Sequence, residues 1–234
     1  MVLGGSGVIG GAIATAFGQQ GWTVGIHYHQ HQSAAIETAT IVKKAGGKGY
    51  LYQADVADSS QVRDTLQNFI QSHSSLNVLV WAVGVGSSTL LIKTSPEDWT
   101  RTLQTNLTGA YHVLKAIAPI FEQQNDGAVI LVGSLSGEQG IAGQASYAAS
   151  KAGLLGLMRT AAREWGAFNI RVNVIFPGWH LSSLSKPGWH SAMKHNTHTL
   201  HRIPSLKYVG TSVYHLALSP DTSGQVWNLD SRIW

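Results

Sequence analysis

Tyr147 and Lys151 are four residues apart, a spacing that suits acid–base chemistry. On a helix, residues i and i+4 share one face, so these two side chains would lie side by side. A free tyrosine has a pKa near ~10, and an adjacent ammonium group stabilises its phenolate and lowers that pKa. Tyr147 could then exchange a proton with a carbonyl or alcohol oxygen. Ser134, at the carboxyl end of an expected strand, could hydrogen-bond the same oxygen where charge develops during the reaction.

A glycine-rich segment near the N-terminus, residues 3–14, follows a short apolar lead and opens an expected helix. Glycines let the backbone turn tightly and approach a pyrophosphate, whose charge then lies at the positive end of the helix. The segment favours nucleotide binding, although a tight turn without a ligand is the alternative. Its lead, residues 1–3, is shorter than a usual strand of five or six residues, so we expect a truncated strand or one that begins upstream.

Apolar segments alternate with helical patterns along the chain. Strands are expected at residues 22–27, 49–53, 78–83, 128–132, 171–176 and 225–229, and helices at residues 10–20, 33–45, 59–72, 96–117, 146–166 and 206–218. Strands that are apolar on both faces, each followed by a helix, predict a parallel sheet with helices on both sides. The expected fold class is therefore α/β, a doubly wound parallel sheet in a single domain over residues 1–234.

The composition excludes several classes of protein. Only 12% of the residues are charged, against ~25% in a typical domain, and 44% are hydrophobic, which is not a disordered composition. A surface poor in charge favours a homo-oligomer, which covers part of it. The absence of cysteine excludes a disulfide scaffold and thiolate metal sites. A net charge of +4 with no basic run longer than Lys43-Lys44 disfavours nucleic acid, and no apolar segment reaches the ~18 residues of a membrane span. The N-terminus lacks the positive leader of a signal peptide.

Further residues follow in a fixed order: Asp55-Val56, Asn106, Ser134, the segment Tyr147 to Lys151, and Pro177-Gly178. This series resembles the short-chain dehydrogenase/reductase family over essentially the whole chain. The match is closest to its 3-oxoacyl-[acyl-carrier-protein] reductase branch, through residues 143–153 and 169–173.

The resemblance implies a Rossmann-like fold and a cytoplasmic oxidoreductase that transfers a hydride between NADP(H) and a carbonyl or alcohol substrate, with a 3-oxoacyl thioester as one candidate. It implies a homotetramer or homodimer. Its catalytic residues would be Asn106, Ser134, Tyr147 and Lys151, where Asn106 holds a water that links Lys151 to solvent and Lys151 contacts the nicotinamide ribose. The implied cofactor-binding residues are Gly4, Gly5, Ser6, Gly7, Ile9, Gly10, Asp55, Val56, Ala82, Gly84, Tyr147, Lys151, Pro177, Gly178, His180 and Ser182.

The sequence departs from the family pattern at the cofactor site. Val8 replaces the middle glycine of the TGxxxGxG motif, and a β-branched residue is poorly suited to positive φ, so we expect an altered loop. The NNAG motif reads Trp81-Ala82-Val83-Gly84, with Trp81 expected in the core. No acid stands at the end of the second strand, residues 27–31, where it would repel a 2′-phosphate. NADP(H) is therefore favoured, and NAD(H) stays open because no arginine is present there either.

Two departures lie in the last third of the chain. Ser182 takes the place of the threonine that contacts the carboxamide, and Leu229 to Arg232 replaces Val-Asp-Gly-Gly, which leaves the exact assembly open. Residues 178–204 break the alternation of elements, and a long insertion after a late strand lies over the ligand-binding edge, so they are expected to form a substrate lid.

Histidines cluster in two places. His195, His198 and His201 could share one helical face, but without a fixed acidic or cysteine partner a solvated or substrate-facing lid is favoured, and no metal site is expected. His27, His29 and His31 alternate as on a strand end. Two interpretations stay open: one of these histidines contacts a phosphate, or all three are plain surface residues.

Two other functions compete with a carbonyl reductase. The altered glycine loop and the missing NNAG motif would suit a catalytically silent subunit with a structural or regulatory role, and the glycine spacing alone suggests a nucleotide-sugar epimerase or dehydratase. The intact set of four catalytic residues favours the reductase. The acidic segment 122–126 would not attract an acidic carrier protein, so a free or CoA-linked substrate stays open.

Overall fold

The computed structural model describes residues 1–182, 185 and 198–232. Within them, one seven-stranded sheet has the order β3-β2-β1-β4-β5-β6-β7, and every pairing is parallel. The strands are β1 (Val2–Leu3), β2 (Thr23–Tyr28), β3 (Lys48–Gln53), β4 (Val78–Trp81), β5 (Gly127–Val132), β6 (Ile170–Phe176) and β7 (Val226–Asn228). The expected Rossmann-like, doubly wound single domain is confirmed.

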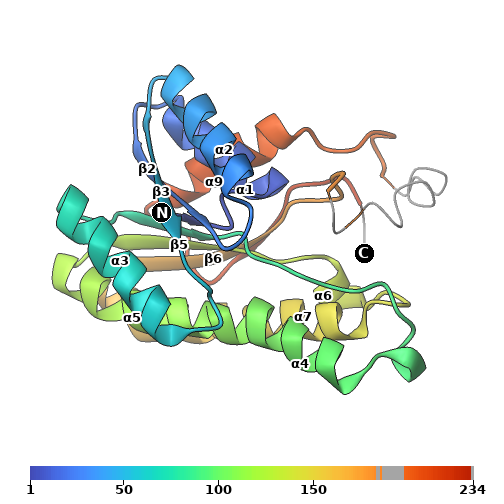
Figure 1. Cartoon of the computed structure of the whole chain (residues 1–234). Helices are drawn as coiled ribbons and strands as arrows, with labels where there is room; N and C mark the ends of the chain where they lie inside the picture. The colour runs from blue at the N-terminus through green and yellow to red at the C-terminus, as the bar shows by residue number, and fades with distance from the viewer. Residues whose placement is uncertain (183–184, 186–197, 233–234) are drawn as a thin grey trace.

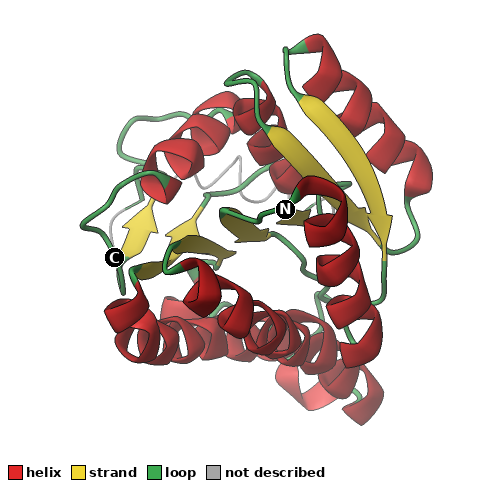
Figure 2. Cartoon of the chain, turned by 90° about the vertical axis from the view of Figure 1, so that its left-hand side faces the viewer, coloured by secondary structure: helices red, strands yellow, loops and turns green. Residues whose placement is uncertain are grey.

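Helices cover both faces of the sheet (Figures 1 and 2). On one face lie α1 (Val8–Gly18), α2 (Gln32–Lys44) and α9 (Leu206–Ala217), and on the other lie α3 (Ser59–His73), α4 (Pro96–Leu103), α5 (Gly109–Gln124) and α7 (Ala145–Trp165). Two buried apolar clusters correspond to these two layers, one on each side of the sheet. The inner strands contribute to both clusters, because their alternate side chains point to opposite faces.

Local signals in the sequence explain where helices begin. The Ser95 hydroxyl accepts a hydrogen bond from the Asp98 amide at 3.1 Å, and Pro96 occupies the first helical position of α4. The Asp58 carboxylate caps α3 in the same way, because it accepts hydrogen bonds from the amides of Ser60 and Gln61. These caps fix the loops that follow β3 and β4 at the carboxyl edge of the sheet.

The strand order reverses between β1 and β4. The chain proceeds from β1 outward to β2 and β3, then returns to the other side of β1 and proceeds to β7. In doubly wound sheets ligands bind outside the carboxyl ends of the strands at this reversal point. The site must therefore be sought where β1, β4, β5 and β6 end.

The expected helix over residues 96–117 is divided into three parts. A π-helical segment, Gln104–Thr108, joins α4 to α5, which continues to Gln124 with Pro119 inside it. Asn106 lies within this segment and is fully buried. π-Segments inside helices are frequent at functional sites, and the irregular turn here directs a polar side chain inward. A four-residue helix, α6 (Ser136–Gln139), was also not expected.

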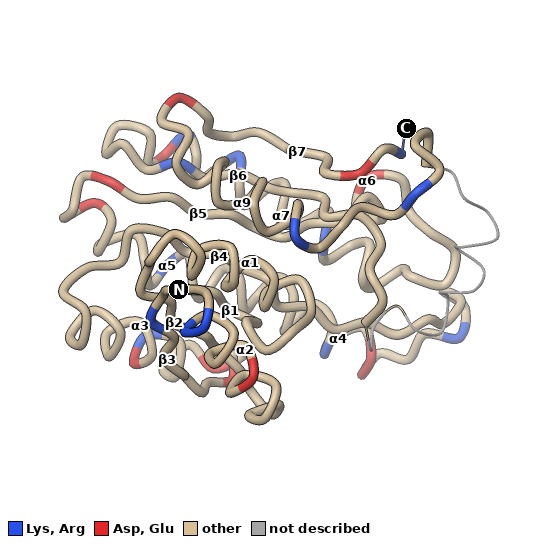
Figure 3. Tube along the Cα trace, turned by 90° about the horizontal axis from the view of Figure 1, so that it is seen from above, with Lys and Arg blue, Asp and Glu red and all other residues tan. Residues whose placement is uncertain are grey.

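Charged residues are sparse and scattered along the chain trace (Figure 3). No helix among the described residues is long and apolar enough to cross a membrane. Most of the expected lid, residues 183–184 and 186–197, lies outside the described part of the chain.

Candidate active site

The acid–base residues meet where β5 ends and α7 begins. Tyr147 and Lys151 lie on α7, and Ser134 follows β5 after one residue. Tyr147 and Ser134 line the same cavity, and the Lys151 ammonium lies 5.6 Å from the centre of the Tyr147 ring. The structure therefore brings together the three residues whose chemistry the spacing suggested.

The pKa of Tyr147 differs in direction from the expectation. Burial raises the pKa of Tyr147, and the hydrogen bond from Ser134 offsets only part of that rise. The expected lowering by Lys151 is not found, because the ammonium lies beside the ring and loss of water around the phenol dominates. In the protein alone, Tyr147 keeps its proton at neutral pH.

Lys151 is almost completely buried, with 3% of its surface exposed. Its ammonium donates to the carbonyl oxygens of Val132 at 2.8 Å and Val83 at 3.4 Å, which belong to the ends of β5 and β4. Burial lowers the pKa of Lys151 to about 8. The lysine is therefore a cation held between two strand ends, with a proton that is easier to lose than usual.

Asn106 links the π-segment to the end of β4. Its side-chain oxygen accepts from the Val85 amide at 2.8 Å, and its side-chain nitrogen donates to the Val85 carbonyl at 2.8 Å and to the Ser150 hydroxyl at 3.0 Å. Trp81, at the first position of the missing NNAG motif, is fully buried in the core, as expected. Asn106 thus ties the strand end in a chain that lacks the two asparagines of that motif.

The glycine-rich turn between β1 and α1 has the shape of an anion cradle. Gly4 has a φ of +78°, and its carbonyl accepts from the Gly7 amide at 2.9 Å. A Cβ on Gly10 would lie 2.3 Å from the Gly4 carbonyl oxygen, so no side chain fits there. Gly7 caps α1 without a side chain, and the first turn carries no acid, which leaves the positive helix end open to a phosphate.

Val8 does not distort this turn. It is the first residue of α1 and is 41% exposed, and it is not among the residues with positive φ. The turn instead takes its positive φ at Gly4, so the altered conformation expected from Val8 is not needed. Gly5 packs against Ile26, and Ser6 lies between Gly5 and the cap residue.

The ends of β2 and β3 form the part of the edge that lies on the far side of the glycine turn. The Asp55 carboxylate accepts from the Ala57 amide at 2.9 Å and lies 3.9 Å from the exposed His29 ring. The Val56 side chain is buried in the core, so only its backbone faces this edge. His31 is exposed. His27 is buried, with 3% exposed, and the expectation of a phosphate contact or a surface position is wrong for it.

The loop after β6 forms the other part of the edge. Pro177, Gly178, His180 and Ser182 all line one cavity with Ser134, Tyr147 and Ile9. The His180 ring lies 2.8 Å from the Pro177 carbonyl oxygen, and the hydroxyls of Ser182 and Ser185 lie 3.2 Å apart. Ala82 and Gly84 follow β4, between these two parts of the edge. The Ala82 carbonyl covers Gly4, and a Cβ on Gly84 would lie 3.5 Å from the Lys151 ammonium.

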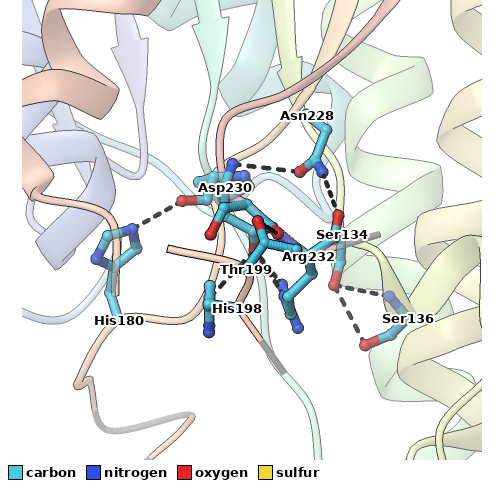
Figure 4. A network of polar contacts seen from close by, with 10 residues as sticks. Ser134, Ser136, His180, His198, Thr199, Asn228, Asp230 and Arg232 are labelled. Atoms are coloured by element: carbon cyan, nitrogen blue, oxygen red, sulfur yellow. Dashed lines mark hydrogen bonds and ion pairs between the residues drawn. The ribbon is translucent and has the colours of Figure 1, made fainter. Parts of the chain in front are cut away.

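The cavity contains residues that sequence reasoning missed. Ser136 and Gln144 extend a hydrogen-bond chain from Ser134, with Ser136 donating to Gln144 at 2.9 Å. Arg232 also lines the cavity, as Ser134 does (Figure 4). The replacement of the family's C-terminal Val-Asp-Gly-Gly by Leu229 to Arg232 was the signal for it.

The second histidine group does not form a helical face. His195 lies outside the described residues, His198 forms an isolated bridge with Arg232, and His201 follows in a turn. The described residues contain no group of three histidine, cysteine or acidic side chains that could hold a metal.

A dinucleotide fits this edge by the chemistry of the groups present. The glycine turn and the first turn of α1 would hold a pyrophosphate, Asp55 and the end of β2 would face the adenosine half, and the cavity beside Tyr147 and Ile9 would take the nicotinamide.

Comparisons with known proteins agree with this geometry. A model of the short chain dehydrogenase family matches residues 1–191. The 3-oxoacyl-[acyl-carrier-protein] reductase FabG of Staphylococcus epidermidis is 32% identical over 185 residues, which cover 79% of this chain and 76% of that protein. The corresponding reductase of Chlamydia trachomatis is 33% identical over 186 residues, 80% of this chain and 75% of that protein.

Solved structures show the same fold. A putative short-chain alcohol dehydrogenase from Sinorhizobium meliloti superposes with a TM-score of 0.90 at 28% identity, covering 98% of this chain and 93% of that one. Levodione reductase superposes with a TM-score of 0.94 at 21% identity, covering 98% and 94%, and shows the fold. The chain therefore belongs to the short-chain dehydrogenase/reductase family, is similar to its 3-oxoacyl reductase branch, and is an NAD(P)-dependent oxidoreductase.

Proposed function

We propose that the protein interconverts a carbonyl compound and the corresponding alcohol, with Tyr147 as the proton donor and acceptor at the reacting oxygen and NADP(H) as the preferred cofactor. The observation that carries the proposal is that Tyr147 and Ser134 line one cavity, with the buried Lys151 ammonium beside the tyrosine ring. When bound, the nicotinamide supplies or accepts the hydride.

The residues of the chain divide the remaining work. Ser134 donates a hydrogen bond to the substrate oxygen, where negative charge grows during reduction. Tyr147 transfers its proton to the same oxygen, and the raised pKa of the phenol keeps that proton in place until it is needed. Lys151 keeps its ammonium beside the Tyr147 ring, and Asn106 holds the end of β4 against α7, so that Lys151 keeps its carbonyl partners.

The choice of NADP(H) is supported by the end of β2. His29, Gln30 and His31 follow the strand, and none of them is acidic. A carboxylate at this position would repel a 2′-phosphate, whereas histidine side chains can donate hydrogen bonds to it. The requirement for reduced nicotinamide supports a cytoplasmic location, and exposed apolar residues at Leu90, Leu91 and Ile92 support a homo-oligomer.

The names of the relatives suggest a substrate class. Two of them are named for reduction of 3-oxoacyl groups on a carrier protein, so a 3-oxoacyl thioester is one candidate. The silent-subunit alternative is not favoured, because the proton donor, its hydrogen-bond partner and the buried cation all have the arrangement that turnover needs.

Binding and turnover of the cofactor test the proposal. Titration of the protein with NADPH and NADH, followed by fluorescence, should give saturable binding that is tighter for NADPH. A panel of carbonyl compounds should then be reduced, and Tyr147→Phe should abolish turnover while nucleotide affinity stays within about twofold. Tyr111→Phe, an exposed tyrosine on α5, is the matched control and should behave as the wild type. Absence of nucleotide binding below millimolar concentration, or turnover by Tyr147→Phe equal to wild type, would refute it.

A further inference from the structure

Arg232 carries the only formal charge among the described residues that line the cavity. The rest of that lining consists of glycines, serine hydroxyls, apolar side chains, Gln144, Tyr147, Trp179 and His180, and none of the described lining residues is an aspartate or a glutamate. A cation placed among neutral groups in a partly enclosed site attracts anions more strongly than one on the open surface.

The guanidinium of Arg232 is held in one orientation. Its Nε and Nη2 donate to the Asp230 Oδ2 at 2.7 and 2.5 Å. The main chain of Arg232 is fixed as well, because its amide donates to Asp230 Oδ1 at 2.9 Å and its carbonyl accepts from the Asn228 side chain at 3.2 Å. These contacts fix the guanidinium before any substrate arrives, which lowers the entropy lost on binding.

The two charges of this ion pair face different ways. The Asp230 side chain is fully buried and does not line the cavity, and a Cβ on Gly178 would lie 3.0 Å from its Oδ2. Of this pair, Arg232 lines the cavity together with Ser134 among the described residues, and Asp230 does not (Figure 4). Within the described part of the chain, Nη1 has no hydrogen-bond partner in the protein, so its donors are available to a ligand.

We propose that Arg232 binds an anionic group of the substrate, and that the preferred substrates are short oxo acids and the corresponding hydroxy acids with a free carboxylate. A guanidinium presents parallel N–H donors that match the two oxygens of a carboxylate. Arg232 shares one cavity of about 370 Å³ with Ser134 and Tyr147, so the anion would lie in the same cavity as the reacting carbonyl. A phosphate at the distant end of a thioester arm does not meet this condition. The inference rests on the proposed reductase function and adds the substrate class.

The reaction on such a substrate is balanced by the groups already named. The hydride forms the new C–H bond at the carbonyl carbon, the C=O π electrons move to oxygen, and the Tyr147 proton forms the O–H bond. The carboxylate keeps its charge throughout, so Arg232 binds substrate and product alike. Loss of Arg232 should therefore act mainly on KM.

Turnover of matched substrates provides the first test. The wild type should reduce 3-oxobutanoate with a kcat/KM at least tenfold above that for its methyl ester. Arg232→Met should lower kcat/KM for the acid by about tenfold to a hundredfold, the range expected for hydrogen bonds to a charged group, and leave the ester unchanged. The kcat/KM of Arg232→Lys for the acid should lie between the values of the wild type and of Arg232→Met. Arg202→Ala, which removes an exposed arginine outside the cavity lining, is the control. It should leave kcat/KM unchanged for both substrates.

The Arg232→Met variant removes the arginine partner of the buried Asp230 and leaves, among the described residues, only His198 as an ion-pair partner, 3.8 Å away, which endangers folding. The double variant Asp230→Asn with Arg232→Gln removes both charges and keeps side chains that can hydrogen-bond. It should show the same loss for the acid. Equal losses for acid and ester in the double variant and in Arg232→Lys would mean that Arg232 only holds the C-terminal segment, and would overturn the proposal.

Ligand binding provides a test that does not depend on turnover. Trp179 lines the cavity, so its fluorescence should respond to occupants. In the presence of saturating cofactor, butanoate should bind at least tenfold more tightly than butanamide to the wild type, and this preference should be lost in the double variant. Equal affinities would overturn the proposal even if the reductase function holds. Failure of nucleotide binding and of all turnover would instead overturn the proposed function.

Thioesters separate the two sources of negative charge. A 3-oxobutanoyl thioester of N-acetylcysteamine is neutral, whereas the CoA thioester carries phosphates. If Arg232→Lys impairs only the CoA thioester and spares 3-oxobutanoate, the anion is a phosphate and the carboxylate assignment is wrong. Impairment of 3-oxobutanoate with both thioesters spared supports it.

Discussion

The buried imidazole of His27 accepts a hydrogen bond from the Gly4 amide at 3.1 Å. Because Gly4 N–H donates to Nδ1, the ring proton is on Nε2, which donates to the Ala54 carbonyl at 3.0 Å. One neutral histidine on β2 thus connects the first glycine of the turn between β1 and α1 to the end of β3. A protonated ring would place a second N–H against the Gly4 amide and lose the acceptor.

Acid should destabilise the protein through His27. Burial lowers the pKa of His27 to about 4, partly offset by the hydrogen bond to Ala54. Between that value and the unfolded pKa near ~6.5, the unfolded chain binds a proton that the folded chain does not, so stability falls as the pH falls through this window. The loss is on the order of 3 kcal/mol. Urea unfolding at pH 7 and pH 4.5 should show it.

His27→Asn provides the comparison, because asparagine does not titrate. The difference in unfolding free energy between pH 7 and pH 4.5 should be smaller in this variant than in the wild type. His31→Asn, at an exposed position, is the matched control and should keep the wild-type difference. Identical pH dependence in all three proteins would contradict the role of His27.

Lys151 should lower the stability of the folded protein although turnover requires it. Burial lowers the pKa of Lys151 to about 8, which means that the charged form is unfavourable in the folded protein at neutral pH. This penalty is complete below pH 8 and disappears as the pH rises toward the ordinary value near ~10.4. Lys151→Met should therefore raise the unfolding free energy at pH 7 by about 1–3 kcal/mol and abolish turnover.

Calorimetry of the proteins without ligand measures the difference in stability between the wild type and Lys151→Met, and steady-state kinetics measure the difference in turnover. The gain in stability should shrink when the same pair is compared at pH 9.5, since the wild-type lysine is then largely neutral. Lys115→Met, an exposed lysine on α5 that lies 5.8 Å from the Tyr111 ring, is the control and should change neither property by much. A destabilised Lys151→Met protein at pH 7 would show that the two carbonyl contacts outweigh the burial of the charge.

Asn106→Ala should lower both stability and turnover. The substitution removes three hydrogen bonds and leaves the Val85 amide and carbonyl without their partner. An unsatisfied buried group costs about 1–3 kcal/mol, and because Val85 is only partly buried we expect a total loss of about 1–3 kcal/mol. Asn68→Ala, on the exposed face of α3, is the matched control and should stay within about 0.5 kcal/mol of the wild type. Equal melting temperatures for the two variants would contradict the anchoring role of Asn106.

The sequence predicted the sheet, the order of elements and the residues gathered at its carboxyl edge, because apolar periodicity and helix caps act over a few residues. It did not predict the π-segment at Asn106, whose irregular turn depends on hydrogen bonds to Val85, distant in the chain. The burial of His27 also depends on tertiary contacts, since only the packed β3 supplies the Ala54 carbonyl. The pKa of Tyr147 was misjudged for the same reason, because neighbours in sequence show the lysine and not the loss of water.

The position of Arg232 at the cavity could not be predicted from the sequence either. Nothing local to residues 229–232 indicates that they reach a cavity formed by residues near 134 and 178. The contacts of Ser231 with Thr199 and of Asp230 with Gly178 place the segment there. A departure from a family motif was visible, but its consequence required the fold.

Glycine substitutions distinguish a required cradle from an ordinary helical glycine. A Cβ on Gly10 would meet the Gly4 carbonyl oxygen at 2.3 Å and the Gly5 Cα at 3.1 Å, whereas a Cβ on Gly156 in α7 would meet nothing within 4 Å. Gly10→Ala should therefore force the turn apart, destabilise the protein by more than about 2 kcal/mol and weaken NADPH binding at least tenfold. Gly156→Ala should stabilise α7 by about 0.5–1 kcal/mol and leave NADPH binding unchanged. Thermal unfolding and fluorescence titration of the two variants measure both effects, and unchanged nucleotide affinity in a folded Gly10→Ala protein would show that the turn between β1 and α1 does not hold the cofactor.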